Sequence, residues 1–428
     1  MFSVIFTRIL LAYTFCTIRM VMKNKIVLTL LVLTTWTTAA SARDMWIGIE
    51  PFVLKSITDS RQRVFEYKDI IKGSKETYFR VEEKETYKIS HFIHHNFQRC
   101  GGYRVLHNKP EVEVKLMDKK ALVRSTFGEY DFQKLINPDY SINQASLVES
   151  WLPQVSRQYT NSVITHLTSY RTRFYKSEEG VAALKWIGSE WERLTASRND
   201  MKVDYFYYQT HDQPSVILTI EGSDPVLKDE VIVIGGHGDS INDTEHSAAV
   251  AAPGADDNAA GIAILSDLTR IIVEQNYKPK HTIQIIAYAA EEVGIQGSYD
   301  LARVYRDKQT KVIGVLQLDG VNYKGSPDYD FALISDFTNN DQNLFLASLI
   351  DTYLKLPWTW DQCNYGCSDH AAWNYYGFRA SFPAEALIKE ENPYIHSVED
   401  TFDKSNFDSV HAVKFTKLAI AYLLELDQ

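Results

Sequence analysis

The spacing of hydrophobic residues changes from segment to segment in the second half of the chain. Apolar residues recur every three or four positions over 148–155 and 181–191, which predicts amphipathic helices. Residues 231–236 form a continuous, mostly β-branched run, as in a strand buried on both faces. Similar patterns predict a helix over 259–273, a strand over 282–289, a helix over 294–305 and a strand over 312–318. This alternation predicts an α/β sheet of parallel strands covered by helices.

The region before residue 140 has a different pattern. Short alternating segments at 111–116 and 121–124 predict strands of a small α+β unit. The dipeptide Asn137-Pro138 is a turn signal and marks a boundary. We therefore expect two parts, residues 43–139 and residues 140–428.

The N-terminal residues 1–42 look like a targeting segment. Their two apolar stretches, 9–18 and 26–33, are each too short to span a bilayer comfortably. Basic residues precede the second stretch and the small residues 40–42 follow it, which is the layout of a secretory signal peptide. The alternative, a membrane anchor built on the first stretch, has too little apolar length between its flanking arginines. We predict a signal peptide whose true start is Met22, and an exported protein with no membrane span after processing.

Composition and charge exclude several classes of protein. With 428 residues, 45% of them hydrophobic and 23% charged, the chain is neither disordered nor collagen-like nor a coiled coil. Its formal net charge is -10, and the acidic surplus lies after residue 140. Such a body repels phosphate backbones and attracts cationic peptide N-termini, so we expect no nucleic-acid partner.

Two of the four cysteines lie close together. Cys363 and Cys367 flank three residues, and a disulfide could close this loop in an oxidising compartment. Closing so short a loop adds little to the global stability of the fold. The purpose of the disulfide would therefore be to hold Tyr365 in place locally. The alternative is a pair of small buried thiols. Cys100 has no obvious partner, which suggests that its segment is not kept in the final product.

Three predicted strands end at residues that can bind metal or transfer protons. The strand over 231–236 runs into His237, the next into Glu291 and Glu292, and the third into Asp319. Ligands bind outside the carboxyl ends of parallel strands, so these side chains should converge. Three such strand ends together predict a site.

Two further segments extend this predicted site. Asp256 and Asp257 directly precede the helix over 259–273, and a helix N-cap would explain one of the two acids but not the pair. His396 lies on a turn-rich loop late in the chain. Two histidines with three or four carboxylates suit zinc, or manganese or cobalt, in a two-metal hydrolase.

From about residue 146 to its C-terminus, the sequence resembles the M28 zinc aminopeptidases of the bacterial secreted leucyl type. The matching blocks, in the family's order, are 172–175, 235–240, 252–261, 291–294, 318–319, 367–370 and 396–397. Residues 99–103 also resemble the removable propeptide of secreted relatives. The resemblance implies the zinc exopeptidase fold, a mixed, mostly parallel central sheet flanked by helices. A small α+β propeptide at 43–139 would precede this catalytic domain at 140–428.

The resemblance implies two zinc ions per chain, with manganese or cobalt as substitutes. Asp257 would bridge both ions. His237 and Asp319 would complete the first ion's ligands, and Glu292 and His396 the second's.

The resemblance also implies the catalytic roles. Glu291 would be the general base that takes a proton from the attacking water, while Asp239 would hold the tautomer of His237. Tyr365, in a loop closed by the Cys363–Cys367 disulfide, would donate to the oxyanion. Gly238 departs from the family pattern, in which a side chain is usual, but the change removes no ligand.

The function that this resemblance implies is a secreted, monomeric aminopeptidase acting on peptides and proteins with a free N-terminus. Two other classes remain open, a single-zinc enzyme like glutaminyl cyclase and a metal-free binding module. The full set of five ligands favours the first reading. The three classes differ in metal content, with about two, one or no zinc ions per chain.

The substrate pocket is expected to be apolar with some acidic character. Its expected lining residues are Gly320, Leu333, Phe382, Ile388, Glu391 and Ile395. We predict a preference for bulky apolar N-terminal residues such as leucine, with lysine or arginine as the alternative. We also expect residues 43–139 to act as a chaperone or inhibitor that is later cut away.

Overall fold

The computed structural model describes most of the chain after the predicted signal peptide. The described residues are 44–49, 51–59, 64–73, 76–97, 103–106, 110 and 138–428. The predicted signal peptide, the strands predicted at 111–116 and 121–124, and Cys100 lie outside them.

A six-stranded sheet forms the centre of the part after residue 138. Its spatial order is β12-β9-β7-β8-β6-β5. The strands β12, β9, β7 and β8 are parallel, β6 is antiparallel to β8, and the edge strand β5 is antiparallel to β6 and so runs in the same direction as β8. The bounds are β5 Met201–Phe206, β6 Ser215–Ile220, β7 Glu230–His237, β8 Thr282–Tyr288, β9 Lys311–Gln317 and β12 Ala380–Ser381. The mixed, mostly parallel sheet that we predicted is confirmed.

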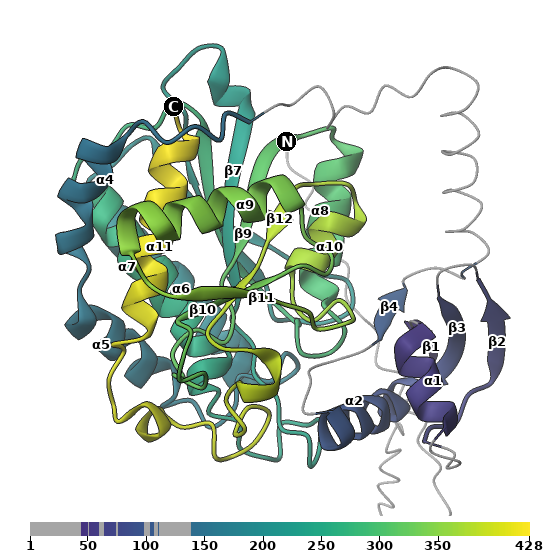
Figure 1. Ribbon diagram of the computed structural model, residues 1–428. Coiled ribbons are helices and arrows are strands. Elements are labelled where there is room, and N and C mark those ends of the chain that lie inside the picture. The colour runs from purple at the N-terminus through teal and green to yellow at the C-terminus, as the bar shows by residue number, and fades with distance from the viewer. Residues whose placement is uncertain are drawn as a thin grey trace, which may run out of the picture. The chain divides into compact units, whose positions relative to one another are not determined.

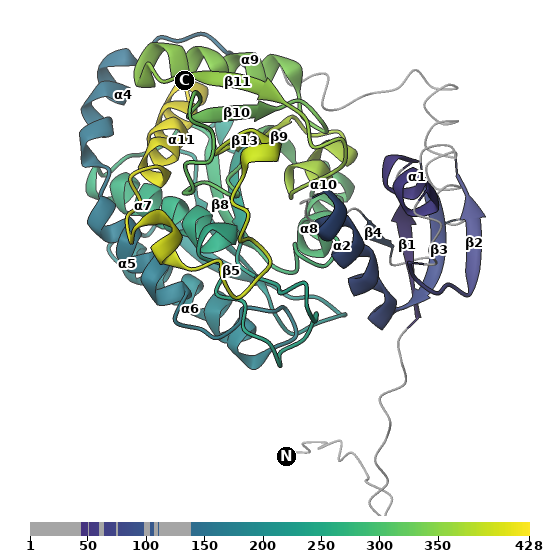
Figure 2. The same cartoon turned by 60° about the horizontal axis from the view of Figure 1, so that its bottom comes forward.

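Helices cover both faces of this sheet (Figures 1 and 2). One face carries α4 Ala145–Trp151, α5 Arg157–Leu167, α6 Glu178–Thr195, α7 Gly261–Glu274 and α11 Ala412–Leu426, and the other carries α8 Gln296–Asp307 and α10 His370–Tyr375. The central strand β7 has both faces buried: Ile232 and Ile234 join the larger core, whereas Val231 and Val233 join a second cluster with Leu301 of α8. This explains why the run at 231–236 is continuously apolar.

A second, three-stranded sheet lies beside the first, near helix α9 Asn340–Leu349. Its order is β11-β10-β13, with β10 Phe331–Ile334 parallel to β11 Trp358–Asp361 and antiparallel to β13 Pro383–Ala384. Figure 2 shows these strands together. Short helical turns complete this part of the chain at Leu152–Gln154, Leu227–Asp229, Ala255–Ala260, Ile350–Leu354, Ile388–Glu390 and Phe402–Ser405.

The described residues before 107 form the expected small α+β unit. Its four-stranded antiparallel sheet has the order β2-β3-β1-β4. The bounds are β1 Asp44–Ile49, α1 Pro51–Asp59, β2 Asp69–Lys72, β3 Thr77–Glu82, α2 Glu83–Phe97 and β4 Arg104–Leu106. Ile47, Phe79 and Ile89 are buried in a separate hydrophobic core of this unit.

None of the helices in the described ranges combines the length and the apolar character needed to cross a bilayer.

Candidate active site

The first group of site residues comes from the ends of neighbouring strands. His237 is the last residue of β7, which pairs with β9 on one side, and Asp319 follows β9 by two residues. His237 Nε2 lies 3.1 Å from Asp319 Oδ1 and 3.0 Å from Asp257 Oδ1. The sheet register thus brings together residues that are far apart in the sequence.

The second group shares one of these residues. His396 Nε2 lies 3.0 Å from Asp257 Oδ2 and 2.9 Å from Glu292 Oε2. Asp257 therefore presents one carboxylate oxygen to each histidine. In each group, the potential ligand atoms lie within 4.8 Å of one another.

The turn before α7 explains how Asp257 becomes available. Asn258, not either aspartate, bonds to the helix start: its Oδ1 accepts from the Gly261 backbone N–H at 2.9 Å. Its Nδ2 donates to the Leu318 backbone oxygen at 2.9 Å. The N-cap alternative for one aspartate is therefore wrong. Gly254 has a φ of 55°, in the left-handed region where a side chain is disfavoured.

A carboxylate lies behind each histidine, near its Nδ1 atom. Asp239 Oδ1 is 3.4 Å from His237 Nδ1, and Asp243 Oδ2 is 3.5 Å from His396 Nδ1. Carboxylates in this position favour the tautomer whose Nε2 is free to ligate. The resemblance to the M28 family implied this position for Asp239, which follows His237 by two residues. Asp243 was not predicted, because nothing in the sequence connects it with the distant His396.

The donor atoms fit a divalent cation. Among the described residues, neither Asp257 Oδ2 nor Glu292 Oε1 accepts a hydrogen bond, although both side chains are buried. Burial raises the pKa of the Glu292 carboxyl to about 8, and the charge of Asp257 adds to this rise. Buried carboxylates that repel one another require protons or cations. Two groups of one imidazole and two carboxylates, with one carboxylate shared, suit zinc.

Glu291 belongs to neither group but lies beside both. Its backbone N–H donates to Asp239 Oδ1 at 3.0 Å, and that of Glu292 donates to Oδ2 of the same side chain at 3.2 Å. Burial raises the pKa of the Glu291 carboxyl well above 4.5, and the charges of Asp369 and Glu292 oppose its ionisation further. Asp239 thus orients a histidine and the two glutamates together.

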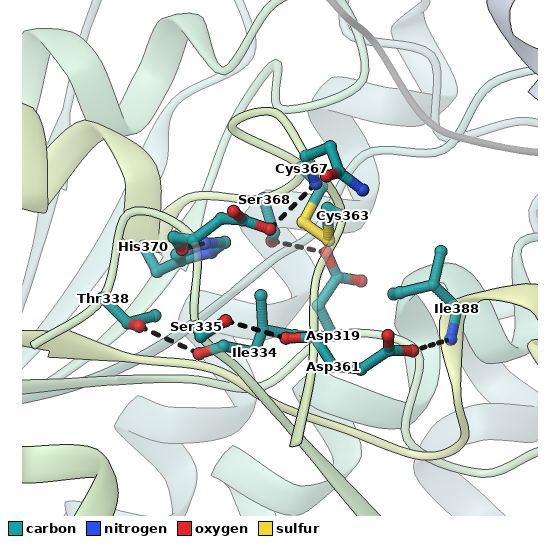
Figure 3. Close-up of a disulfide and its surroundings, with 12 residues drawn as sticks. Asp319, Ile334, Ser335, Thr338, Asp361, Cys363, Cys367, Ser368, His370 and Ile388 are labelled. Carbon is teal, nitrogen blue, oxygen red and sulfur yellow. Dashed lines mark hydrogen bonds between the residues drawn. A yellow bond between two sulfur atoms is a disulfide. The ribbon is translucent and has the colours of Figure 1, made fainter. Parts of the chain in front are cut away.

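Asp319 is held by a polar network that sequence reasoning did not predict. Ser368 Oγ donates to Asp319 Oδ2 at 2.5 Å (Figure 3). Gln317 Nε2 donates to both Ser368 Oγ and Asp369 Oδ2 at 3.1 Å. The block 367–370 was noted as a family motif, and this network gives two of its residues a physical role.

The disulfide between Cys363 and Cys367 is present, with the two Cα atoms 6.2 Å apart (Figure 3). It closes the loop that contains Tyr365, which is buried. Tyr365 and both cysteines line the same pocket as Asp257 and Asp319. The loop is therefore next to the two groups.

Most of the predicted pocket residues line this pocket: Gly320, Phe382, Ile388, Glu391 and Ile395. Leu333 does not, and packs instead in the main hydrophobic core. Asp256, Glu385 and Asn392 also line the pocket but were not predicted.

Comparisons with known proteins identify the chain. The model of "Peptidase family M28" matches residues 215–421. Leucine aminopeptidase 1 of Arthroderma otae is 34% identical over 299 residues, which are 67% of this chain and 78% of the relative. A probable aminopeptidase of Saccharomyces cerevisiae is 30% identical over 292 residues, again 67% of this chain and 77% of the relative.

Solved structures agree with this relationship. LapB from Legionella pneumophila has a TM-score of 0.74 at 28% identity and covers 90% of this chain and 100% of its own. The LapA aminopeptidase of the same species has a TM-score of 0.74 at 26% identity, with coverage of 90% and 99%. Residues 138–428 alone could not fill this share, so the similarity extends into the N-terminal part.

The helix-flanked mixed sheet, with its linked groups of histidines and carboxylates, defines a metallohydrolase. The chain belongs to peptidase family M28. It is a metallo-aminopeptidase, and its substrates are peptides. Enzymes of this family depend on zinc, and both groups described above are candidate zinc sites.

Proposed function

We propose that this protein is a secreted aminopeptidase that uses two zinc ions to hydrolyse the N-terminal peptide bond of peptides and proteins. The observation that carries this proposal is the position of Asp257, whose two carboxylate oxygens lie 3.0 Å from His237 and from His396, respectively. A shared carboxylate between two groups is what a two-metal site requires. His237 and Asp319 would hold one ion, Glu292 and His396 the other.

Bound zinc would polarise the carbonyl of the scissile bond and make the attacking water more acidic. Glu291 would accept the proton from that water and pass it to the leaving amine. Its carboxyl is buried, and its backbone N–H is fixed by a hydrogen bond to Asp239. Tyr365 would donate a hydrogen bond to the carbonyl oxygen as negative charge develops there.

The two alternative classes require fewer ligands than this chain retains. A single-zinc cyclase or a metal-free binding module would have no need of both groups. Here both are complete, and their side chains are largely buried.

A Glu291→Gln variant tests the proposal most directly. It should keep two zinc ions per chain and lose about 100- to 10,000-fold in kcat, because it removes the base but no ligand. Zinc content is measured by elemental analysis, and turnover with an aminoacyl p-nitroanilide. Glu399→Gln is the matched control, since Glu399 is an exposed acid near His396, and should keep both properties. Wild-type protein with no zinc and no amide hydrolysis would reject the proposal.

The pocket supports a preference for bulky apolar N-terminal residues. Phe382, Ile388 and Ile395 supply apolar walls. Burial raises the pKa of Glu385 well above 4.5, and the charge of Asp256 adds to this, so the charged form of Glu385 is disfavoured. Besides Asp256 and the carboxylates proposed to bind zinc, Glu391 is an acidic residue of the pocket lining. Its negative charge could attract a basic side chain. This is the observation that favours the second candidate, a preference for lysine or arginine.

The ratio of kcat/KM for Leu- and Lys-p-nitroanilide separates these two preferences. We expect a higher value for leucine, and a ratio that rises further in Glu391→Gln because the pocket loses negative charge. Glu390→Gln is the control: Glu390 accepts a hydrogen bond from Ser326 and should leave the ratio unchanged. A clear preference of the wild type for lysine would overturn the first choice.

We further propose that residues 1–42 direct export and that residues 43–139 are a propeptide, which acts as a chaperone or inhibitor until it is removed. The separate hydrophobic core of the described N-terminal unit supports a segment that folds as a unit of its own. N-terminal sequencing of active secreted protein should find a start near residue 140, and a start at Arg43 would contradict removal. Size-exclusion chromatography should show a monomer.

A further inference from the structure

Arg173 is a buried arginine that hydrogen-bonds to two loops of the first group, the one after His237 and the one that carries Asp257. It lies between α5 and α6, and its side chain is fully buried. Its Nε donates to the Gly238 backbone oxygen at 2.9 Å, and its Nη2 donates to that of Gly254 at 2.8 Å. Gly238 follows His237, and Gly254 begins the turn that carries Asp257. One planar guanidinium therefore joins the two loops.

The backbone around Arg173 strengthens this connection. The Arg173 N–H donates to Ser240 Oγ at 3.0 Å, and Ser240 Oγ in turn donates to the Ala252 backbone oxygen at 2.7 Å. The Ala252 N–H donates to the Arg171 backbone oxygen at 2.8 Å. Three segments, around residues 172, 239 and 253, are thus joined through backbone and side chain.

The charge of Arg173 is as informative as its geometry. Its hydrogen-bond acceptors are neutral carbonyl oxygens, including those of Pro253 and Leu167. Burying a guanidinium without a bonded carboxylate is costly unless nearby negative charge compensates. Burial lowers the pKa of Arg173, while the charges of Asp400, Asp257 and Asp239 oppose this effect. The cation therefore lies behind the acidic centre and offsets part of its charge.

We propose that Arg173 is a positioning residue of the metal centre, which fixes the distance between the loops of His237 and Asp257 and offsets the charge of the surrounding carboxylates. This inference rests on the proposed zinc site. It gives a role to the block 172–175, which the sequence singled out without assigning a function. Because all hydrogen bonds of the guanidinium within the described residues go to backbone oxygens, it acts through the ligands and not on the substrate.

Two substitutions separate the effect of joining the two loops from the effect of the positive charge. Arg173→Lys keeps the charge but cannot reach both Gly238 and Gly254 as a planar fork does. Arg173→Gln loses the charge as well. Zinc affinity, measured by competition with a chromogenic chelator, should fall about 10- to 100-fold in the lysine variant, as for other residues that orient metal ligands, and further in the glutamine variant.

A control variant distinguishes this role from a general loss of stability. Arg198 is also largely buried, and it bonds to Asp200 and to the Tyr277 backbone oxygen. Arg198→Lys should lower the melting temperature and leave zinc affinity unchanged. If Arg173→Lys lowers only the melting temperature of the metal-free protein and binds zinc as the wild type does, the proposal is overturned.

A milder variant covers the case in which neither Arg173 variant folds. Ser240→Ala removes one hydroxyl from the same connection and should weaken zinc binding by a few fold. Unchanged zinc affinity in Ser240→Ala would then overturn the proposal. Wild-type protein that binds no zinc would instead reject the zinc site itself, so the two failures can be told apart.

Discussion

The two groups of candidate metal ligands are built in different ways. His237 and Asp319 lie at or just after the ends of β7 and β9, whose register is set by backbone pairing such as Gly235 with Gln317. Glu292 and His396 lie on loops. The first group is therefore positioned by the sheet, and the second depends on hydrogen bonds between loops.

Asp400 and Asp243 supply those hydrogen bonds. The Asp400 carboxylate accepts from the backbone N–H groups of Asp256 and Asp257 at 3.2 and 3.1 Å. The Asp243 N–H donates to the His396 backbone oxygen at 2.9 Å. One half of the site is thus held by strand pairing and the other by hydrogen bonds between loops, and the two halves should respond differently to perturbation.

Asp257→Asn should have the largest effect, because it removes the carboxylate that both groups share. We expect less than one zinc ion per chain and a loss of activity of at least about 1,000-fold, since the proposed chemistry depends on both ions. Elemental analysis and p-nitroanilide turnover provide the measurements. A variant that still holds two ions would show that the groups are independent of Asp257.

Stepwise removal of metal compares the two groups directly. Chelator titration of the wild type should release the ion at Glu292 and His396 first, because loops hold its ligands. His396→Ala should abolish this first step, whereas His237→Ala should abolish the second. His166→Ala, at a half-buried residue of α5 that belongs to neither group, should keep both steps. Release of both ions in a single step with identical affinity would contradict the difference between the groups.

The carboxylates behind the histidines should have smaller and unequal effects. Asp239→Asn should weaken zinc binding in both groups, because Asp239 lies behind His237 and also holds the N–H groups of Glu291 and Glu292. Asp243→Asn should weaken only the ion at His396. Changes of about 10- to 100-fold in affinity are expected, measured by chelator competition. An effect of Asp239→Asn on the ion at His237 alone would show that Asp239 does not connect the groups.

Removing the disulfide should have the smallest effect of the changes considered. Replacing Cys363 and Cys367 together by serine should cost at most about 2 kcal/mol of unfolding free energy, because the closed loop is short. Zinc content should stay at two, while kcat falls a few fold as Tyr365 gains freedom. Urea unfolding and turnover measure the two effects. Loss of zinc in this double variant would mean that the loop supports the metal ligands as well.

Much of the site could be predicted because strand ends are visible in the sequence. The continuous run at 231–236 and the residues directly after it locate His237, and the same reasoning applies to Glu292 and Asp319. Asp243, Asp400 and Arg173 could not be found in this way. Their partners are backbone groups or distant side chains, and such contacts leave no spacing pattern in the sequence.

The error at Leu333 has a physical cause in the strand period. Successive residues of β10 point to opposite faces, so that Ala332 and Ile334 join the cluster around Tyr365, whereas Phe331 and Leu333 join the main core. All four residues are buried. Hydrophobicity therefore does not reveal which face each residue takes, and a shift of one residue places the wrong side chain in the pocket.

The carboxylate of Asp257 also determines how the enzyme would respond to scarce metal. Because one side chain is shared by both groups, the first ion to bind would restrict its rotation and change the affinity for the second, and linkage would make this coupling equal in both directions. Chains that hold a single ion would then be rarer or commoner than expected for two independent sites. A plot of activity against the concentration of free zinc should therefore differ from the curve expected if the two sites filled independently.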